Sequence, residues 1–317
     1  MKAMVLNAPG GVENFELKEI EDPTIKPNEV LVKVRAISIN PVDTKTRDGK
    51  AYYPQMKEDA HVLVGWDISG EVVAAGHEVS LFKEGDEVFG MVNFPGKGRA
   101  YAEYVAAPET HLALKPTTIS HQEAAAATLA ALTAWQVLVH EAGIQPGQRV
   151  LIHAAAGGVG HFAVQIAKHF KAYVIGTASA QNADFLQELG ADEHIDYQTE
   201  EFTEKARDVD LVLDSLGVEN SLRSLKTLKD WGKLVSILGG AKEEVQEAAS
   251  ARNIEAKNYL VHSSGEDLAQ LADLLRFGHL KSHIYRTYAF EDMAAAHTQV
   301  ESRKTRGKVV VEVLPEE

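Results

Sequence analysis

A turn of small residues is the clearest chemical feature of this chain. Residues 149–170 read RVLIHAAAGGVGHFAVQIAKHF, an apolar run followed by glycines and then by apolar positions at helical spacing. A strand must therefore pass directly into a helix whose N-terminus faces an anionic ligand. Gly157 is expected to allow a sharp turn, Gly158 to let the backbone approach the ligand, and Gly160 to allow close helix–strand packing. The backbone of this stretch, Val159 included, would contact the pyrophosphate of a dinucleotide.

The fingerprint starts with Ala154 rather than glycine, and A-x-x-G-x-x-G after L-I-H-A resembles a known family. That family is the medium-chain dehydrogenase/reductase superfamily, particularly its zinc-free quinone oxidoreductase and alkenal (enone) reductase branch. Further motifs extend the resemblance over nearly all of the chain: S-I-N-P-V-D at 38–43, G-x-x-I-S-G-E-V at 65–72, G-D-E-V-F-G at 85–90, L-T-A-W at 132–135 and R-G-K-V-V-V at 306–311. The resemblance implies an α/β fold with a Rossmann doubly wound parallel sheet and a GroES-like β-barrel catalytic domain.

The resemblance also shows where a catalytic zinc ion would have to bind. Zinc-dependent members carry a Cys at the position of Asn40, a His at that of Trp66 and another Cys near Leu129. An amide, an indole and an aliphatic side chain cannot replace thiolate and imidazole ligands, and the chain contains no cysteine. Trp66 and its neighbour Asp67 are expected to line or brace this region instead. We predict no metal site, which suits acceptors that are already electrophilic, such as quinones and conjugated carbon–carbon double bonds.

By resemblance, the catalytic residues are Tyr52, Asn40 and Asp43. Asn40 would hydrogen-bond the substrate oxygen or the nicotinamide carboxamide; capping of the helix that follows it is the alternative. Tyr52 is expected to donate a hydrogen bond to the oxygen on which charge develops. The neighbouring Tyr53, or stacking of a tyrosine on a flat substrate, remains open. For Asp43 the alternative is a structural role as an anchor of its loop.

The end of the second Rossmann strand indicates the cofactor. NAD-specific folds tend to place an acid there, whereas this chain has Thr177 and Ser179, whose hydroxyls can donate to a 2′-phosphate. By resemblance, Tyr197 and Arg303 contact the adenosine phosphate, and NADPH is the predicted cofactor. Gln181 stands where the family usually has a lysine, so the preference over NADH is expected to be modest. The remaining cofactor contacts are expected by resemblance at Thr133, Leu238 and Gly239.

Composition limits the possible partners of the protein. The net charge of -14 and the pI near 5.4 argue against binding to nucleic acid or to an anionic membrane. The start of the sequence lacks the apolar segment of a secretory signal, and no stretch is long enough to span a bilayer. We therefore expect a cytoplasmic protein, and a homodimer, that acts on a small quinone or enone.

The length of 317 residues and the element pattern predict two domains. Short strands separated by turn residues extend to about residue 116, and Ser120 with Glu123 forms a capping-box pattern that begins a helical stretch. Residues 1–118 and 266–317 are predicted to form the GroES-like domain, and 119–265 the Rossmann domain. The strands of the Rossmann domain after the glycine turn are predicted at 172–177, 193–196, 210–214, 233–238 and 259–261.

The main hypothesis is therefore an NADPH-dependent, zinc-free oxidoreductase that transfers hydride to quinones or α,β-unsaturated carbonyls. The residues do not separate quinone reduction from enone reduction. The alternative is a dinucleotide-binding protein of the same fold with little or no catalytic turnover. Nucleic-acid binding is disfavoured by the net acidity and by the absence of a long basic run.

Overall fold

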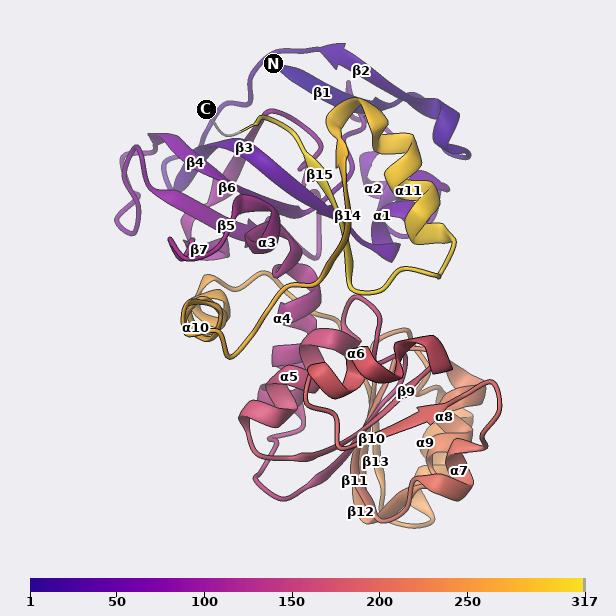
Figure 1. Cartoon of the computed structure of the whole chain (residues 1–317). Coiled ribbons are helices and arrows are strands. Elements are labelled where there is room, and N and C mark those ends of the chain that lie inside the picture. The colour runs from indigo at the N-terminus through magenta and orange to yellow at the C-terminus, as the bar shows by residue number, and fades with distance from the viewer. Residues whose placement is uncertain (316–317) are drawn as a thin grey trace. The chain divides into compact units, whose positions relative to one another are not determined.

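The computed structural model describes residues 1–315, which fold into two compact units (Figure 1). Unit 1 comprises Met1–Leu132 and the chain from Val261 onward, and unit 2 comprises Thr133–Leu260. The predicted divisions at 118/119 and 265/266 therefore differ from those of the structure. The first division shifts because helix α3 (His121–Ala126) packs on the strands of unit 1.

Unit 1 contains two sheets. In the smaller one β1 (Lys2–Leu6) pairs antiparallel with β2 (Phe15–Glu19). The larger, mainly antiparallel sheet runs in the order β14-β15-β3-β4-β5-β7, with β6 paired to β3. Its strands are β3 (Glu29–Ile39), β4 (Asp67–Ala75), β5 (Glu87–Met91), β6 (Tyr104–Pro108), β7 (Leu112–Leu114), β14 (Ile284–Ala289) and β15 (Lys308–Glu312). The helices are η1 (Val12–Asn14), α1 (Pro41–Arg47), α2 (Tyr53–Met56), η2 (Glu109–His111), α3, α10 (Gly265–Arg276), η5 (Phe290–Asp292) and α11 (Met293–Glu301), while α4 (Leu129–Trp135) crosses the division between the units.

Strand β3 organises the larger sheet of unit 1. In its first half, buried valines alternate with the half-buried Leu31, Lys33 and Arg35, as expected for a strand with one face on the core, and its second half is fully buried. Its first half pairs with β6, its second half pairs with β15, and β4 pairs along most of its length. The strand ends at Ile39, and the next residue, Asn40, is the N-cap of α1.

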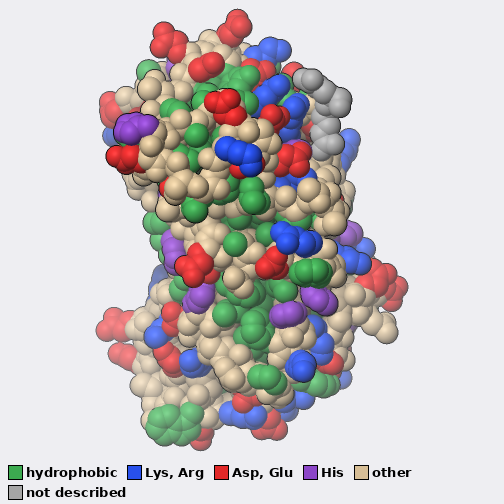
Figure 2. Space-filling view, turned by 90° about the vertical axis from the view of Figure 1, so that its left-hand side faces the viewer, with side chains coloured by type: hydrophobic (Ala, Val, Ile, Leu, Met, Phe, Trp, Pro, Cys, Tyr) green, Lys and Arg blue, Asp and Glu red, His purple; other side chains and the backbone are tan. Residues whose placement is uncertain are grey.

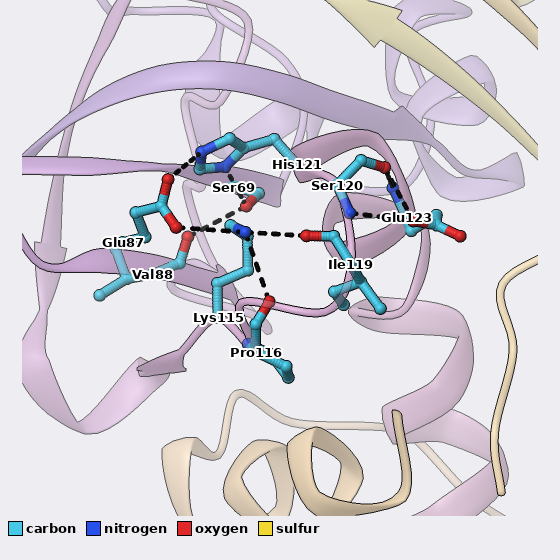
Figure 3. A network of polar contacts seen from close by, with 9 residues as sticks. All are labelled: Ser69, Glu87, Val88, Lys115, Pro116, Ile119, Ser120, His121 and Glu123. Atoms are coloured by element: carbon cyan, nitrogen blue, oxygen red, sulfur yellow. Dashed lines mark hydrogen bonds and ion pairs between the residues drawn. The ribbon is translucent and has the colours of Figure 1, made fainter. Parts of the chain in front are cut away.

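The chain between β7 and α3 is fixed by a polar network (Figure 3). Lys115 donates to the carbonyl of Ile119 at 2.8 Å and forms an ion pair with Glu87 of β5 at 3.2 Å. The predicted capping box is confirmed, because the amide N–H of Ser120 donates to Glu123 and that of Glu123 donates to the Ser120 hydroxyl. These contacts set the point at which α3 begins.

Unit 2 is a six-stranded parallel sheet in the order β10-β9-β8-β11-β12-β13, which confirms the predicted doubly wound α/β fold. Helices α5 and α6 lie on one side of the sheet, and α7, α8 and α9 lie on the other (Figure 1). The strands are β8 (Arg149–Ile152), β9 (Tyr173–Ala178), β10 (Glu193–Asp196), β11 (Val209–Asp214), β12 (Leu228–Ser236) and β13 (Glu255–Asn258). The helices are the π-helix η3 (Gln136–Glu141), α5 (Gly160–His169), η4 (Ala180–Asn182), α6 (Ala183–Glu188), α7 (Phe202–Lys205), α8 (Val218–Ser224) and α9 (Glu243–Ser250).

The last strand of this sheet was predicted in the wrong place. The apolar run at 259–261 indicated a strand, but β13 is the more polar segment Glu255–Asn258 just before it. An edge strand has a neighbour on one side only, here β12, so it does not need apolar residues on both faces. The core of unit 2 lies between the sheet and its helices, and includes the buried Leu151, Ile175, Val212 and Leu234.

Acidic and basic side chains are interspersed rather than segregated on the face drawn in Figure 2. Within residues 1–315, no helix has both the length and the hydropathy that crossing a lipid bilayer requires.

Candidate active site

The glycine-rich segment of unit 2 forms the predicted strand–turn–helix, from β8 through residues 153–159 to α5. A Cβ atom at Gly160 would lie 2.3 Å from the carbonyl oxygen of Ala154, so this glycine permits the close packing predicted for it. The sharp turn, however, is made by Ala154, whose φ of 48° lies in the left-handed region. Gly157 was predicted to make that turn; it instead closes it through an N–H bond to the Ala154 carbonyl at 2.9 Å.

The residues between this turn and α5 are accessible to a ligand. Gly157, Gly158 and Val159 are half-buried, whereas Gly160 is buried at the first position of α5. The first N–H groups of a helix have no partner within it and carry its positive dipole end. This turn therefore has the geometry that binds a pyrophosphate.

Thr177 does not offer the donor that the sequence predicted. The side chain is only 2% exposed at the end of β9, and its Oγ1 lies 3.1 Å from Nδ1 of the buried His153. The other ring nitrogen of His153 lies 2.9 Å from Ser224 Oγ, which donates its own hydrogen to the Asn220 carbonyl. Ser224 must therefore accept from His153, and Thr177 must donate to the remaining ring nitrogen. Its hydroxyl hydrogen is thus directed into the protein.

Ser179 and Tyr197 remain accessible at the same edge of the sheet. Ser179 follows β9, and its hydroxyl oxygen accepts from Asn182 at 3.1 Å, which leaves the hydroxyl hydrogen for another acceptor. Tyr197 follows β10, is 60% exposed, and its N–H donates to the Ala178 carbonyl. Because β9 and β10 are parallel neighbours, the two side chains follow adjacent strand ends. No acid follows β9 before Asp184.

The other predicted cofactor residues lie in three separate places. Leu238 is 51% exposed after β12, and Gly239 beside it has a φ of 72°, which glycine adopts without strain. Thr133 is buried in α4, at the start of unit 2. Arg303 is exposed and belongs to unit 1, where it follows α11 with a φ of 56°.

In unit 1, Asn40 belongs to a buried polar cluster. The amide Nδ2 donates to Asp67 Oδ2 at 2.7 Å, and the amide oxygen accepts from the ammonium group of Lys308. Asp67 also accepts from the N–H of Leu129 at 3.1 Å, and all three polar side chains are at most 3% exposed. Burial raises the pKa of Asp67 and lowers that of Lys308, while their mutual attraction opposes both shifts. The amide of Asn40 is thus fully used inside the protein, which argues against the predicted contact with substrate.

Asp43 is also buried, and the structure favours the anchoring role. Its Oδ2 accepts from the N–H of Asn40 at 2.9 Å and from the hydroxyl of Tyr101 at 2.9 Å. Burial, which the Asn40 N–H bond opposes and the charge of Asp67 reinforces, raises the pKa of Asp43 to about 8. Tyr101 in turn lies 2.8 Å from Nε2 of His297 in α11, whose pKa burial lowers to about 3. These contacts join α1 and α11, and none of these side chains is exposed enough to contact a substrate.

Tyr52 is the predicted catalytic side chain that stays accessible. It is half-buried before α2, and its ring packs edge-on against Trp66 at 5.3 Å and Phe94 at 5.2 Å. Burial raises the pKa of its phenol, so the hydroxyl remains protonated at neutral pH. Trp66 is fully buried and donates to the Gly96 carbonyl at 2.9 Å, which confirms a bracing role. Tyr53 is the first residue of α2 and is also half-buried.

Lys308 and His153 are among the residues of these networks that were not found from the sequence. Lys308 lies within the R-G-K-V-V-V motif, where a lysine among apolar strand residues on a core face signals a buried partner. His153 lies at the same kind of position, directly after the buried strand β8. Their partners are distant in sequence, so only the fold identifies them.

A GroES-like sheet unit and a doubly wound unit in one chain define an oxidoreductase of the alcohol dehydrogenase fold class. Residues 26–117 match the family Alcohol dehydrogenase GroES-like domain, and residues 189–311 match the family Zinc-binding dehydrogenase. The chain therefore belongs to the medium-chain dehydrogenase/reductase superfamily, among relatives that are quinone oxidoreductases and alkenal/enone reductases.

Three relatives illustrate this membership. A 2-methylene-furan-3-one reductase of Solanum lycopersicum and an NADPH-dependent alkenal/one oxidoreductase of Arabidopsis thaliana are each 34% identical, over 99% of this chain and 80% of theirs. The quinone oxidoreductase of Coxiella burnetii is similar in structure, with a TM-score of 0.92 and 35% identity over 99% of both chains.

The residues of this chain do not fit the zinc ion that one family description names. The three positions expected to hold ligands are brought together, because Asn40 and the N–H of Leu129 both donate to Asp67, the neighbour of Trp66. They present an amide, an aliphatic side chain and an indole whose N–H is already bonded, and none of these is a zinc ligand. The ammonium group of Lys308 lies 3.8 Å from Asp67 and supplies a positive charge there. Within residues 1–315, no group of three or more His, Cys, Asp or Glu is arranged to hold a metal ion.

Proposed function

We propose that this protein is an NADPH-dependent reductase that transfers hydride to quinones or α,β-unsaturated carbonyls without zinc. The observation that carries the proposal is the carboxyl edge of β8, β9 and β10. There an anion-binding turn adjoins the end of β9, which has the accessible hydroxyl of Ser179 and no acid before Asp184. The names of the relatives support the same cofactor and the same acceptor classes.

The residues of unit 2 would hold the adenosine end of the cofactor. The turn at 157–160 would bind the pyrophosphate, and Ser179 and Tyr197 would contact the 2′-phosphate. By family resemblance we propose Arg303 as a further contact of this phosphate. Thr133, Leu238 and Gly239 are the further cofactor contacts that we propose. The bound nicotinamide would supply the hydride.

Tyr52 is the residue that we propose for the chemical step. When hydride adds to the acceptor, an electron pair moves onto the substrate oxygen, where Tyr52 donates a hydrogen bond or its proton. Solvent then returns a proton to the phenolate. Asn40 and Asp43 support this site indirectly, since they fix α1, whose Thr46 hydroxyl accepts from the N–H of Tyr52 at 3.5 Å.

The proposal also includes the oligomeric state and the cellular location of the protein. We propose that it acts as a homodimer and in the cytoplasm, as the sequence leads us to expect. Size-exclusion chromatography with light scattering tests the dimer, because a monomer of 34.5 kDa at all concentrations would contradict it.

A substrate panel tests the function directly. NADPH oxidation is measured with 1,4-benzoquinone, 9,10-phenanthrenequinone and 2-alkenals, and NADP+ reduction with simple alcohols. We expect turnover with a quinone or an alkenal and none with the alcohols. Tight NADPH binding without turnover on any acceptor would support the dinucleotide-binding alternative instead.

The Tyr52→Phe variant tests the proposed donor. We expect a lower kcat, by up to about 10²–10³-fold if the hydroxyl is well placed, with an unchanged Kd for NADPH. Quinones should show the smaller effect, since water can protonate their oxygens. Tyr285→Phe, on the 47% exposed tyrosine of β14, is the matched control. If Tyr52→Phe reduces every acceptor at the wild-type rate while Tyr53→Phe does not, the donor is Tyr53.

A further inference from the structure

His153 lies at the centre of the carboxyl edge of the parallel sheet. It directly follows β8 and directly precedes the left-handed Ala154, and its side chain is 1% exposed. The ring packs edge-on against Phe202 at 4.8 Å and bonds Thr177 on one side and Ser224 on the other. One side chain thus connects the end of β9 to α8 across the strand that leads into the glycine turn.

The bonds around this ring allow one arrangement of hydrogens. Because Ser224 donates to the Asn220 carbonyl at 2.7 Å, it has only lone pairs for the ring and must accept from Nε2–H. Burial lowers the pKa of His153 to about 4, so the ring is neutral and Nδ1 is an acceptor. Thr177 therefore donates to Nδ1, and the tautomer of the ring is fixed.

The chain of hydrogen bonds continues to a buried carboxylate. The side chain of Asn220 donates to Asp214 Oδ1 at 2.8 Å, and the hydroxyls of Ser221 and Ser236 donate to its Oδ2, each at 3.0 Å. Asp214 ends β11 and Ser236 ends β12. Four adjacent strand ends are therefore tied together by one network in which His153 is the connection between β9 and the rest.

The glycine turn depends on this network at two points. The N–H of Ala155 donates to the backbone carbonyl of Thr177 at 2.9 Å, and the hydroxyl of Ser215 donates to the carbonyl of His153 at 3.3 Å. A left-handed alanine persists only where its surroundings hold it. Release of Thr177 or His153 would therefore loosen the turn without removing any group that faces a ligand.

We propose that His153 is a positioning residue for dinucleotide binding, which sets the shape of the 154–160 turn by holding Thr177 through its fixed tautomer. The inference rests on the proposed use of this turn by NADPH. It differs from a direct role of Thr177 as a 2′-phosphate ligand in one measurable way. If the turn loses its shape, the binding of NADPH and of NADH weakens equally, because both cofactors carry the pyrophosphate. If a 2′-phosphate ligand is lost, the binding of NADPH alone weakens.

The test is a double-mutant cycle in which Kd values for NADPH and NADH are measured by calorimetric titration. His153→Leu and Thr177→Val should each raise both Kd values by a similar factor, about fivefold, as expected for one buried hydrogen bond. The double variant should bind no more weakly than the weaker single variant, because both changes break the same bond. His153→Gln retains an acceptor and a donor and should lie closer to wild type. His169→Leu, an exposed histidine at the end of α5, is the matched control.

Several outcomes would overturn this role. If the Thr177→Val variant binds NADPH more weakly but NADH normally, Thr177 is a ligand of the 2′-phosphate. Additive effects in the double variant would separate His153 from Thr177, and wild-type Kd values in both single variants would remove the role altogether. If His153→Leu does not fold, Thr177→Val and His153→Gln still decide the question. Failure of the wild-type protein to bind either cofactor would instead contradict the proposed function.

Discussion

The two units use buried polar groups in different ways. In unit 1 the side chains of Asn40, Asp67 and Lys308 bond one another and are at most 3% exposed. In unit 2 the side chains of His153, Thr177 and Ser224 are equally buried, but they belong to a sheet edge at which Ser179 is half-buried and Tyr197 is 60% exposed. The first arrangement satisfies its own groups, and the second supports groups that remain available to a ligand.

This difference decides which predicted site residues can act directly. A polar side chain whose donors and acceptors are all used internally contributes to stability and position, whatever its relatives do at that place. Asn40 is a residue of this kind, and Asp43 is fully buried and bonds Asn40 and Tyr101 through its Oδ2. Ser179, Tyr197 and Tyr52 are at least partly exposed, so they are the residues that we propose for the direct contacts.

The largest effect is expected from removing the cation of unit 1. Lys308→Met leaves Asp67 buried without its counter-charge and should lower the free energy of unfolding by about 3–5 kcal/mol, measured by urea denaturation. The double variant Lys308→Met/Asp67→Leu removes both charges and should regain much of this loss. Lys304→Met, at an exposed position nearby, is the control. A double variant as unstable as the single one would show that the lone carboxylate is not the cause.

The two units also differ in how much of their candidate site residues' environment could be predicted from the sequence. The turn at 154–160 is a local pattern in which glycine spacing and the flanking apolar residues act over a few positions, so it could be recognised directly. The saturated state of Asn40 depends on Lys308, which lies 268 residues away, and no local pattern reports such a partner. For the same reason Thr177 was taken as a phosphate donor, because its bond to His153 crosses from β9 to β8.

The positions of the strands show the same contrast between local patterns and distant partners. Strand β8 could be predicted, because its buried apolar run stands directly before the glycine turn. The edge strand β13 could not, because its pairing with β12 alone places few demands on residue type. The left-handed Ala154 was also missed, since alanine gives no sign that it will adopt a backbone conformation that glycine favours.

Lowering the pH should affect the stability of the two units differently. Burial depresses the pKa of His153 in unit 2 to about 4, from 6.5, so between these pH values the unfolded chain binds a proton that the folded protein does not. This histidine should lower the free energy of unfolding by about 1.4 kcal/mol per pH unit in this range. In unit 1 burial depresses the pKa of His297 to about 3, but the raised pKa of Asp43, about 8, places an extra proton on the folded protein over the same range, so the two effects oppose each other.

Variants test this assignment by denaturation at a series of pH values. His153→Gln should flatten the dependence of stability on pH for unit 2. His297→Gln should make unit 1 more stable at pH 4 than at pH 6.5, because only the effect of Asp43 remains. His169→Gln, on an exposed histidine, should leave the wild-type slope. Wild-type slopes in both buried-site variants would show that these histidines are not neutral in the folded state.

A smaller effect is expected from residues proposed at the 2′-phosphate. Arg303→Ala should weaken the binding free energy of NADPH by about 1.5–3 kcal/mol, because a hydrogen bond to a charged group is lost, and should change that of NADH much less. Ser179→Ala should act in the same direction with a smaller change, and Lys304→Ala is the matched control for Arg303. Titration of each variant with NADPH and with NADH measures these losses of binding free energy. Equal losses for NADPH and NADH would place Arg303 at the pyrophosphate or give it a structural role.

The central claim is zinc-independent hydride transfer from NADPH, and one measurement on a single sample tests it most directly. The rate of NADPH oxidation with 9,10-phenanthrenequinone and with a 2-alkenal is determined before and after treatment with a chelator, together with the zinc content by elemental analysis. We expect turnover that the chelator leaves unchanged, and no stoichiometric zinc, because the three ligand positions carry Asn40, Trp66 and Leu129. One tightly held zinc ion per chain, whose removal abolishes turnover, would contradict the account.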